Sequence, residues 1–379
     1  MRIENVTAFP VSFPIPAQHR VKLGIGQTVK RDAVLVKVET DVGITGWGES
    51  HAARAPTAIA ELINTTLRQL VLGMDAIDID EVWNKVYRMQ LASHGAGAAA
   101  VIGLSGIDMA LWDIAGKREQ KPLFQLLGGK SRAVAAYAGG ISLGFQDASE
   151  LLTEVDTMLA RGYRALKLRL GDTPERDVER VNAVRQHVGE DVVILTDVNT
   201  AYTLAQIAEI FPALDRCNVG WLEEPFAAHD YKNYQAARQL GRTPLAAGEN
   251  HYTRFDFERV VDDAAITIWQ PDLSKTGGIT EGLRIAQLAK PHGFSIHPHT
   301  SLTSLNMAAS VHFLCAIDNG GYFEADCSTF NPFRNELCSP GFVADENAAV
   351  TPLAKFGLGV DVDESLLENF PVMPGPGYV

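Results

Sequence analysis

Three short segments decide the fold: VVILTD at 192–197, GWLE at 220–223 and PLAAGE at 244–249. Each is an apolar run that ends on a carboxylate, and the closing residues Asp197, Glu223 and Glu249 are 26 positions apart. A spacing of about 25 residues accommodates one strand, one helix and two loops. Successive strands would then place three carboxylates on one rim of a parallel barrel, where their oxygens suit a divalent cation such as Mg2+ or Mn2+.

Apolar runs of strand length recur through the middle of the chain, and helical patterns fill the gaps between them. The eight runs lie at 133–139, 165–170, 192–197, 220–224, 244–249, 266–272, 294–299 and 322–326. Eight strands that alternate with helices over about 200 residues favour a (β/α) barrel. An open doubly wound sheet would usually carry a glycine-rich phosphate turn after its first strand, and the sequence has none.

The chain before the barrel follows a different pattern and predicts a separate α+β domain. Residues 1–50 alternate as strands do, with a hairpin turn expected at 41–43, whereas 56–127 have helical periodicity. The segment after residue 345 lacks the strand–helix repeat, and we expect it to pack back on the first domain. The predicted division is therefore 1–127, 128–345 and 346–379.

Composition narrows the class of protein. The 379 residues fit a barrel of about 250 residues with an accessory domain. A net charge of −13 argues against nucleic acid or an anionic membrane as a partner, but not against a small anionic substrate, because a bound cation reverses the local field. The four cysteines show no CxxC spacing, and the N-terminus lacks the apolar core of a signal peptide. No apolar run has the length of a membrane span, so we expect a cytoplasmic protein with reduced thiols.

Two cationic residues, Lys167 and Arg169, close the run at 165–170. Because side chains alternate along a strand, both would point into the barrel mouth. Taken alone, such a pair would more simply form surface salt bridges, but beside three carboxylates a functional role is favoured.

In the run at 220–224, Glu223 and Glu224 must face opposite sides, and the equal spacing favours Glu223 as the metal ligand.

Residues suited to acid–base chemistry stand at the remaining strand ends. Asp272 closes the sixth run, His297 and His299 stand at the end of the seventh, and Glu324 lies in the eighth. An aspartate can orient a neighbouring histidine, fix its tautomer and raise its basicity. A lone histidine at a strand end is more often structural, but an aspartate and a metal site beside it favour a catalytic function.

Six motifs carry a resemblance to a known family: KLRLG at 167–171, TDVNTAYT at 196–203, WLEEPF at 221–226, AGEN at 247–250, QPDLSKTGGITEG at 270–282 and HPHTS at 297–301. In this order and at these intervals they resemble the mandelate racemase-like subgroup of the enolase superfamily. The resemblance covers essentially the whole chain. It implies a modified TIM barrel, (β/α)7β, an N-terminal α+β capping domain and a C-terminal segment that returns to the cap.

The resemblance also implies a role for each residue of the site. The ligands of one Mg2+, for which Mn2+ could substitute, would be Asp197, Glu223 and Glu249. Asp272 and His299 would form the general acid/base dyad, because the family's Pro-His pair falls on Pro298 and His299. Glu324 would hydrogen-bond the substrate carboxylate as negative charge builds, with help from Lys167. Lys275 would be a supporting residue near the site.

One position departs from the family pattern. The strand-two motif is typically Lys-x-Lys, with the second lysine acting as a base, and here that position is Arg169. Arginine is a poor general base and a good clamp for a carboxylate or an oxyanion. A racemase needs a competent base on each face of the substrate, whereas one residue can serve a dehydration. Asp272, in place of a lysine, separates the chain from the muconate-cycloisomerase and dipeptide-epimerase branches.

The predicted function is therefore a Mg2+-dependent dehydration of a sugar-derived 2-hydroxy acid to a 2-keto-3-deoxy acid through a metal-stabilised enediolate. A racemase or epimerase of a 2-hydroxy acid and a cycloisomerase of an anhydro sugar acid or lactone stay open as alternatives. A binding protein without activity is disfavoured, because the carboxylates and the Asp–His pair are all present. The resemblance implies a homo-oligomer, a dimer or an octamer.

Candidates for substrate contacts lie beside the metal ligands and in two loops of the first domain. Asn199 shares a strand face with Asp197. The loop at 14–28 and the segment ESHAARAP at 49–56 would close over the barrel mouth and exclude water. Basic groups there suit a polyhydroxylated monoacid or diacid, unless they are only solvated loop cations. The candidates in these loops are His19, Arg20, Lys22, His51 and Arg54.

Overall fold

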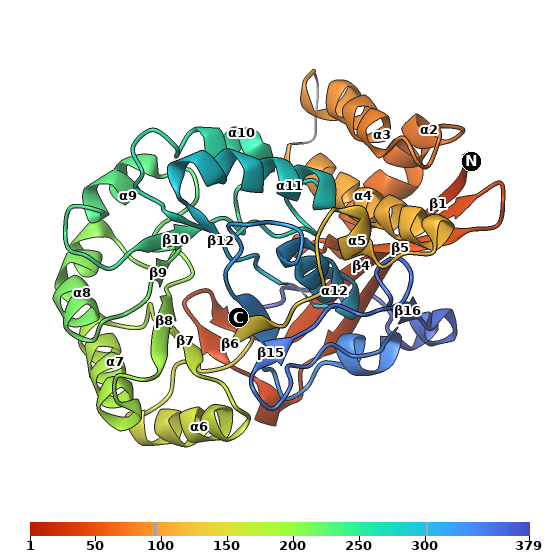
Figure 1. Ribbon diagram of the computed structural model, residues 1–379. Coiled ribbons are helices and arrows are strands. Elements are labelled where there is room, and N and C mark those ends of the chain that lie inside the picture. Colours follow the sequence, from red (N-terminus) through yellow and green to blue (C-terminus); the bar gives the residue numbers. More distant parts are fainter. Residues whose placement is uncertain (94–96, 301) are drawn as a thin grey trace.

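The computed structural model describes residues 1–93, 97–300 and 302–379, so Ser301, the last residue of the HPHTS motif, lies outside the described residues. Figure 1 shows a small N-terminal part, which we call the cap, beside a larger barrel of alternating strands and helices. The fold is the predicted one: a modified α/β barrel with an N-terminal α+β cap.

The cap is built on an antiparallel sheet of strand order β1-β4-β5. Its strands are β1 (Ile3–Pro14), β4 (Lys30–Thr40) and β5 (Thr45–His51), and a small hairpin consists of β2 (Lys22–Leu23) and β3 (Gly26–Gln27). The predicted hairpin turn at 41–43 is confirmed, because Glu39 pairs with Thr45 across it. The helices are α1 (Pro56–Glu61), α2 (Arg68–Val71), α3 (Ile79–Val86), α4 (Ala98–Glu119) and α5 (Leu123–Leu126).

Helix α4 packs against β5 at very close range. A Cβ atom added at Gly48 would lie 2.1 Å from the carbonyl oxygen of Gly106, so only glycine fits there. Because Gly46 and Gly48 face α4, the alternate residues of β5 point to the opposite side, toward the barrel. By length and composition α4 would be able to cross a membrane, but 83% of its apolar window is buried inside the protein. It is the core helix of the cap.

The barrel sheet is parallel and has the strand order β12-β11-β10-β9-β8-β7-β6-β13. Its strands are β6 (Val134–Gly139), β7 (Ala165–Arg169), β8 (Val193–Asp197), β9 (Leu222–Glu223), β10 (Leu245–Ala247), β11 (Ile268–Trp269), β12 (Ser295–Ile296) and β13 (Phe323–Asp326). Every barrel strand is shorter than its predicted run, and β9, β11 and β12 are the shortest, with two residues each. Pro225, Pro271 and Pro298 lie in or just after the runs of these three strands, and proline cannot donate the hydrogen bond that would extend the ladder.

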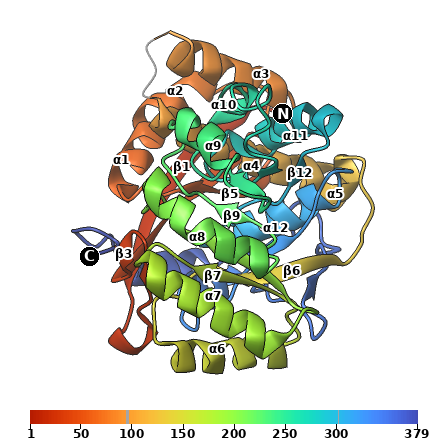
Figure 2. The same ribbon diagram turned by 90° about the vertical axis from the view of Figure 1, so that its left-hand side faces the viewer.

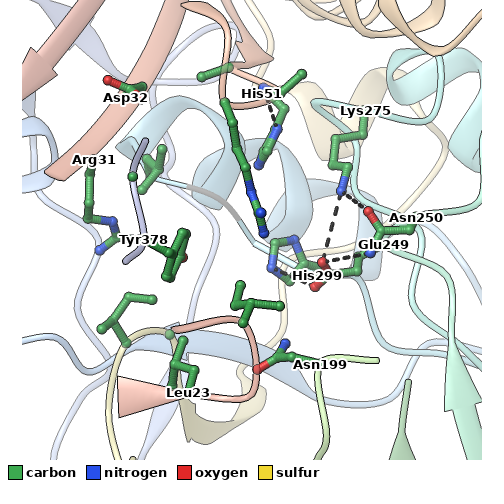
Figure 3. A pocket seen from close by; sticks show the side chains of 18 of the residues that line it. Leu23, Arg31, Asp32, His51, Asn199, Glu249, Asn250, Lys275, His299 and Tyr378 are labelled. Atoms are coloured by element: carbon green, nitrogen blue, oxygen red, sulfur yellow. Dashed lines mark hydrogen bonds and ion pairs between the residues drawn. The ribbon is translucent and has the colours of Figure 1, made fainter. Parts of the chain in front are cut away.

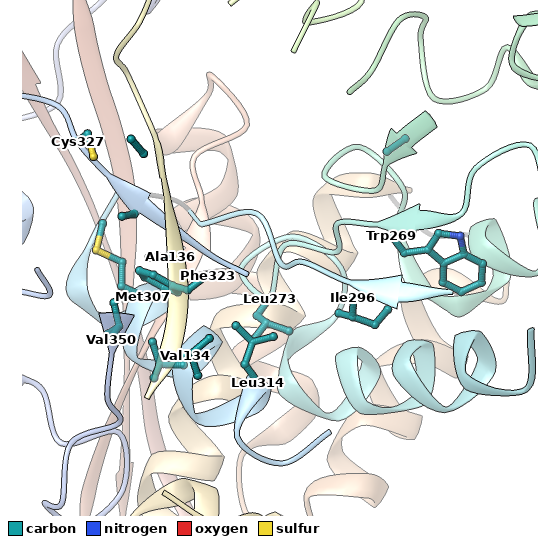
Figure 4. Close-up of a cluster of buried hydrophobic side chains, with 14 of the residues drawn as sticks. Val134, Ala136, Trp269, Leu273, Ile296, Met307, Leu314, Phe323, Cys327 and Val350 are labelled. Atoms are coloured by element: carbon teal, nitrogen blue, oxygen red, sulfur yellow. The ribbon is translucent and has the colours of Figure 1, made fainter. Parts of the chain in front are cut away.

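Helices cover the outside of the sheet, as Figure 2 shows for α6, α7 and α8. They are α6 (Ala148–Ala160), α7 (Pro174–Val188), α8 (Leu204–Arg216), α9 (Tyr231–Ala237), α10 (Thr253–Glu258), α11 (Gly278–Ala289) and α12 (Ser304–Leu314). Apolar side chains from the strands and α12 form a continuous core, part of which is drawn in Figure 4. This core includes Ala136 of β6, Ile296 of β12, Met307 of α12 and Phe323 of β13.

The last part of the chain returns to the cap. It contains the short strands β14 (Cys338–Ser339), β15 (Ala349–Val350) and β16 (Asp361–Val362), and β15 pairs antiparallel with β6. Farther on, the backbone N–H of Val29 donates to the carbonyl of Gly377 at 2.9 Å, and Gln27 and Val379 exchange two backbone hydrogen bonds. The C-terminus therefore lies beside β3, as Figure 2 shows, at the edge of the barrel mouth.

Candidate active site

A cavity of about 350 Å³ lies where the cap covers the carboxyl ends of the barrel strands. The barrel supplies its charged floor: Arg169, Asn199, Glu224, Glu249, Lys275, His299 and Glu324. The cap and the C-terminal segment supply the opposite wall: Leu23, Ile25, Lys30, Arg31, Asp32, His51, Arg54, Gly377 and Tyr378. Figure 3 shows this division, with Glu249, Lys275 and His299 facing Arg31 and Tyr378 across the space.

The predicted dyad of Asp272 and His299 is formed in the structure. His299 Nδ1 lies 2.7 Å from Asp272 Oδ2. The other oxygen of Asp272 accepts hydrogen bonds from the backbone N–H and the hydroxyl of Ser274, each at 2.7 Å, and from Asn306 at 3.1 Å. Burial opposes ionisation of Asp272, but the hydrogen bond and the charge of His299 lower its pKa below the ordinary value. Asp272 therefore stays ionised and holds the imidazole in one orientation.

His299 also meets one of the predicted metal ligands. Its Nε2 lies 3.1 Å from Glu249 Oε2, so the imidazole stands between Asp272 and Glu249. Burial lowers the pKa of His299, but the charge of Glu249 and the hydrogen bond to Asp272 outweigh it and raise the pKa to about 10. Burial conversely raises the pKa of Glu249, whereas His299 and Lys275 lower it to about 2. In this arrangement His299 carries a proton that it can donate.

Lys167 is fully buried at the centre of the carboxylate cluster. Its Nζ lies 2.8 Å from Glu223 Oε1, 2.9 Å from Glu324 Oε1 and 3.5 Å from Asp197 Oδ2, and the ring of Tyr137 lies on another side. Burial lowers the pKa of Lys167, but the charges of Glu223 and Glu324 raise it above its ordinary value. Lys167 is therefore a permanent cation, which stabilises negative charge at the floor of the cavity.

Arg169 faces the cavity from the end of the same strand, as the alternation predicts. Its guanidinium donates to Asp197 and to the carbonyl of Gly140, and it lies 3.3 Å from the side-chain oxygen of Asn199. Burial opposes its charge, but Asp197 raises the pKa of Arg169 still further above its ordinary value. Arg169 cannot release a proton under physiological conditions, which agrees with the role of a clamp.

The adjacent residues Glu223 and Glu224 have different surroundings. Glu223 points into the barrel, where its Oε2 accepts from Trp221 at 3.1 Å and from Gln270 at 2.7 Å. Glu224 lines the cavity, and both of its oxygens accept from Asn250, at 2.9 and 3.0 Å. Burial raises the pKa of Glu223 to about 7, with nearby acids adding to the effect of burial, and burial and Glu249 raise that of Glu224 well above its ordinary value.

The carboxylates at the strand ends suit a cation, although they are not gathered around one point. In the part of the chain that the structure describes, no three acidic, cysteine or histidine side chains have the arrangement of a metal site. Asp197 and Glu223 both lie within 3.5 Å of Lys167 Nζ, so their oxygens already converge on one positive charge. Glu249 is bound to His299 instead. Hard carboxylate oxygens that repel one another are the donor set that Mg2+ prefers, and Asp197, Glu223 and Glu249 would hold it.

Glu324 completes the floor of the cavity. Its Oε1 accepts from the backbone N–H of Gly140 at 3.2 Å and from Lys167, and its Oε2 from that of Thr300 at 3.4 Å. Burial raises the pKa of Glu324, but Lys167 and His299 lower it to about 2. An ionised carboxylate at this place can accept a hydrogen bond from a substrate.

The cap residues divide into two groups. His51 and Arg54 line the cavity as predicted, but His19, Arg20 and Lys22 do not. His19 is stacked on the ring of Phe330, with ring centroids 5.5 Å apart, and its Nδ1 lies 2.7 Å from the hydroxyl of Thr329. Arg20 donates to the carbonyl of Ile15, and Lys22 is exposed. The sequence placed these residues in the right loop, but local contacts turn them away from the cavity.

Several residues that line the cavity were not predicted from the sequence. Arg31 lies on β4, where its guanidinium donates to Ser328 at 3.3 Å and lies 3.7 Å from Asp326. Tyr378 belongs to the C-terminal segment, and the guanidinium carbon of Arg54 lies 5.1 Å from the centre of its ring. The sequence predicted that the end of the chain returns to the cap. It did not predict which residue of that loop-like segment reaches the cavity.

Comparison with known proteins gives the family. Residues 150–366 match the enolase C-terminal domain-like family model, and residues 5–128 match that of the mandelate racemase/muconate lactonizing enzyme N-terminal domain. The chain is 33% identical to an arabinonate dehydratase of Saccharolobus solfataricus, over 89% of this chain and 90% of the relative. It is also 33% identical to a 3,6-anhydro-alpha-L-galactonate cycloisomerase of Streptomyces coelicolor, over 79% of this chain and 82% of the relative.

Solved structures agree with these matches. A member of the enolase superfamily from Polaromonas sp. JS666 is 50% identical and superposes with a TM-score of 0.97 over 100% of both chains. A racemase from Streptomyces coelicolor A3(2), solved with bound magnesium, is 28% identical and superposes with a TM-score of 0.88 over 98% of this chain and 100% of that chain. The chain therefore belongs to the mandelate racemase/muconate lactonizing enzyme family of the enolase superfamily.

Proposed function

We propose that this enzyme is a Mg2+-dependent acid-sugar dehydratase, which converts a sugar-derived 2-hydroxy acid into a 2-keto-3-deoxy acid. The observation that carries the proposal is the asymmetry of the cavity floor. His299, held by Asp272, is a residue that can exchange protons, whereas Arg169 is held by Asp197 and stays charged. A site with one proton-exchanging group beside a fixed cation suits elimination better than transfer of a proton from one face to the other.

The proposed reaction begins with removal of the α-proton. His299 Nε2 takes the proton from C2 of the substrate, and the electron pair of that C–H bond moves into an enediolate of the carboxylate. The C3–O bond then breaks, and the imidazolium returns the proton to the departing hydroxyl, so that one water is lost. The resulting enol tautomerises to the 2-keto-3-deoxy acid. Before the first step His299 must be neutral, which requires that Glu249 be engaged by something other than the imidazole.

The developing negative charge is met by fixed charges. A Mg2+ ion held by Asp197, Glu223 and Glu249 would supply a Lewis acid to the substrate carboxylate and 2-hydroxyl. Lys167, already buried among the carboxylates, would stabilise the enediolate. Glu324 would have to be protonated to donate a hydrogen bond to an enediolate oxygen, which requires that the charge of His299 no longer holds its pKa low. Asn199 and Arg169 would hold the adjacent hydroxyl or carboxylate, because both line the cavity and hydrogen-bond Asp197.

The cap wall suggests the class of substrate. Arg54 faces the cavity with its guanidinium beside the ring of Tyr378, and the described residues give it no hydrogen bond or ion pair. His51 presents a half-buried imidazole, whose Nδ1 accepts from the backbone N–H of Ala53 at 2.9 Å. Burial and Lys275 lower the pKa of His51 to about 3, so it is neutral and offers Nε2–H as a donor. Donors of this kind suit the hydroxyl groups or the distal carboxylate of a sugar acid.

The first experiment is a screen of acid sugars for 2-keto acid formation in the presence of Mg2+. We expect one or a few stereoisomers to be turned over, with loss of activity on chelation and recovery when Mg2+ is added back. The names of the relatives support the choice of library, since they include dehydratases of arabinonate and galactonate. A library that gives no keto acid with the metal-loaded protein would contradict the proposal.

A second experiment separates dehydration from the alternatives. The relatives also include cycloisomerases of an anhydro sugar acid and of a sugar lactone. Incubation in D2O followed by NMR of the recovered acid reports exchange at C2. Exchange with inversion and without keto acid would favour a racemase. Loss of an anhydro ring or lactone without loss of water would favour a cycloisomerase.

A further inference from the structure

We infer that Glu49 of the cap is a positioning residue for the catalytic dyad, acting through Thr303 and Asn306 at the start of helix α12. The inference rests on the proposed function, because it assigns the role through the Asp272–His299 pair. It goes beyond that function by assigning a task in proton transfer to a residue that lies outside the cavity.

Glu49 reaches the barrel because of the way β5 is packed. Gly48 and Ser50 face α4, so Glu49 and His51 point to the other side, and His51 enters the cavity while Glu49 lies one step deeper. Glu49 has no exposed surface. Its carboxylate accepts from the hydroxyl of Thr303 at 2.5 Å and from the backbone N–H groups of Thr303 and Asn306, at 3.2 and 3.4 Å. A cap carboxylate thus fixes the first turn of a barrel helix.

The same turn of α12 holds the dyad. Asn306 donates from Nδ2 to Asp272 Oδ1 at 3.1 Å, and Asp272 Oδ2 holds His299. Asn306 is fully buried, and its own Oδ1 has no partner among the described residues, so the amide is not fixed from that end. Its backbone is fixed by Glu49. A shift of the turn by a fraction of an ångström would move the amide away from Asp272. Only the two hydrogen bonds from Ser274 would then hold Asp272 Oδ1, so the carboxylate and the imidazole would be positioned less firmly.

The burial of Glu49 lowers the stability of the folded protein, so a contribution to stability does not explain why a carboxyl group is there. Its nearest donors are neutral, and its Oε1 has no hydrogen-bond partner in the residues that the structure describes. The ionisable groups that face it are Asp272 and Cys338, neither of which compensates a negative charge, and burial together with Asp272 raises the pKa of Glu49 to about 7. An apolar residue of similar size would avoid this cost. A carboxyl group is nevertheless present where the cap contacts the turn that holds Asp272.

The chain supplies a matched control in Asp108 of α4. Asp108 is also a buried cap acid, it accepts from the backbone N–H of Thr280 in the first turn of α11 at 3.0 Å, and one of its oxygens is likewise without a partner among the described residues. The hydrogen bonds described for it do not reach Asp272 or His299. Loss of Asp108 therefore removes a cap–helix contact of the same kind without disturbing the dyad.

The test compares Glu49→Leu, Glu49→Gln, Asn306→Ala and Asp108→Leu, each loaded with Mg2+. The first readout is the low-field proton resonance of His299 Nδ1–H in the resting protein, assigned by its loss in Asp272→Asn. The second is kcat and KM on the substrate found by the screen. We expect Glu49→Leu and Asn306→Ala to lose or shift the resonance and to lower kcat about 100-fold at nearly constant KM, because small misplacements of catalytic groups have effects of that size.

Glu49→Gln should restore both readouts, because its amide oxygen can accept from Thr303, and Asp108→Leu should leave both unchanged. An unchanged resonance and kcat in Glu49→Leu, or an equal loss in Asp108→Leu, would overturn the inference. If Glu49→Leu does not fold, Asn306→Ala decides, since it removes only the donor to Asp272. If no acid sugar is turned over, the resonance still tests the positioning role, whereas the proposed function fails by itself.

Discussion

The two walls of the cavity differ in how their charged side chains are paired. On the barrel floor three cationic groups have partners of opposite charge: Lys167 with Glu223 and Glu324, Arg169 with Asp197, and His299 with Asp272. On the cap side Lys30 is paired with Asp32 and Arg31 lies 3.7 Å from Asp326, but Arg54 faces only an aromatic ring in the described parts of the chain. The three cations of the floor are held in place before a ligand arrives, whereas the Arg54 guanidinium is left for a substrate to pair with.

Because of this difference, we expect the floor to control the rate of the chemical step and the cap wall to control which substrates bind. Groups held on two or more sides are preorganised and cost no rearrangement when charge develops in the transition state. A lone cation on the cap can adapt to the far end of a substrate, but it contributes to binding more than to the chemical step. We therefore expect substitutions on the floor to lower kcat and those on the cap wall to raise KM.

The largest effect should come from the dyad. We expect His299→Asn to lower kcat by about 10³-fold or more on the acid sugar that the screen identifies, because the group that exchanges the proton is lost. Circular dichroism and Mg2+ binding should be retained. Full activity in this variant would show that the base has been assigned wrongly.

A smaller loss is expected from Arg169→Met. Removal of the guanidinium takes away a fixed positive charge beside the reacting centre and leaves Asp197 without one of its cations, so we expect kcat/KM to fall about 100-fold. Deuterium exchange at C2 of the recovered substrate is the second measurement. If Arg169 itself removed a proton, exchange on one face would disappear completely while exchange on the other continued.

The cap wall should respond differently. We expect Arg54→Ala to raise KM about tenfold with little change in kcat, since one charge-assisted hydrogen bond to the substrate is lost. His19→Ala is the matched control, because His19 lies in a cap loop but is packed on Phe330 outside the cavity, and its kinetics should equal those of the wild type. A large change in His19→Ala, or none in Arg54→Ala, would remove the distinction between the two loops.

The smallest effect concerns stability. Burial raises the pKa of Asp108 to about 7, so the folded state holds this proton more tightly than the unfolded state does. The contribution is stabilising below the unfolded pKa and is lost as the pH rises toward 7. Asp108→Asn cannot ionise, so its unfolding free energy relative to wild type should rise between about pH 4 and 7, by at most about 4 kcal/mol. A pH-independent difference in urea unfolding would contradict the burial of an uncompensated carboxyl.

The barrel floor could be predicted from the sequence because regular elements fix it. Because strands and helices alternate along the chain, the C-terminal ends of all barrel strands lie on one rim. The spacing of Asp197, Glu223 and Glu249 therefore already implied a common site. The family motifs then singled out His299 over His297. In the structure His299 lines the cavity, whereas His297 lies against Trp221 and Tyr322 and its Nδ1 accepts from the backbone N–H of Tyr322. Strands β9, β11 and β12 are shorter than their predicted runs because proline cannot donate a hydrogen bond to the ladder.

The cap side could not be predicted in the same way. His19, Arg20 and Lys22 have the right chemistry in the right loop, but a loop has no period that fixes where its side chains point. Arg31 and Tyr378 are about 350 positions apart, and only folding brings them to one wall. Nothing local distinguishes Glu49 from an ordinary strand residue near a hairpin.

The amino-acid sequence is sufficient to predict the barrel, the carboxylates on its rim, the pairing of Asp272 with His299 and an arginine where a second base would stand. These depend on short-range periodicity and on motifs at fixed intervals, which are visible in a linear chain. Tertiary packing selects the cap residues that reach the cavity, brings Tyr378 there from the end of the chain and sets Glu49 against the turn that holds Asp272. The hydrogen bonds of Glu49 to Thr303 and Asn306 join residues 254 and 257 positions apart, so contacts between separate elements, not local preference, select them.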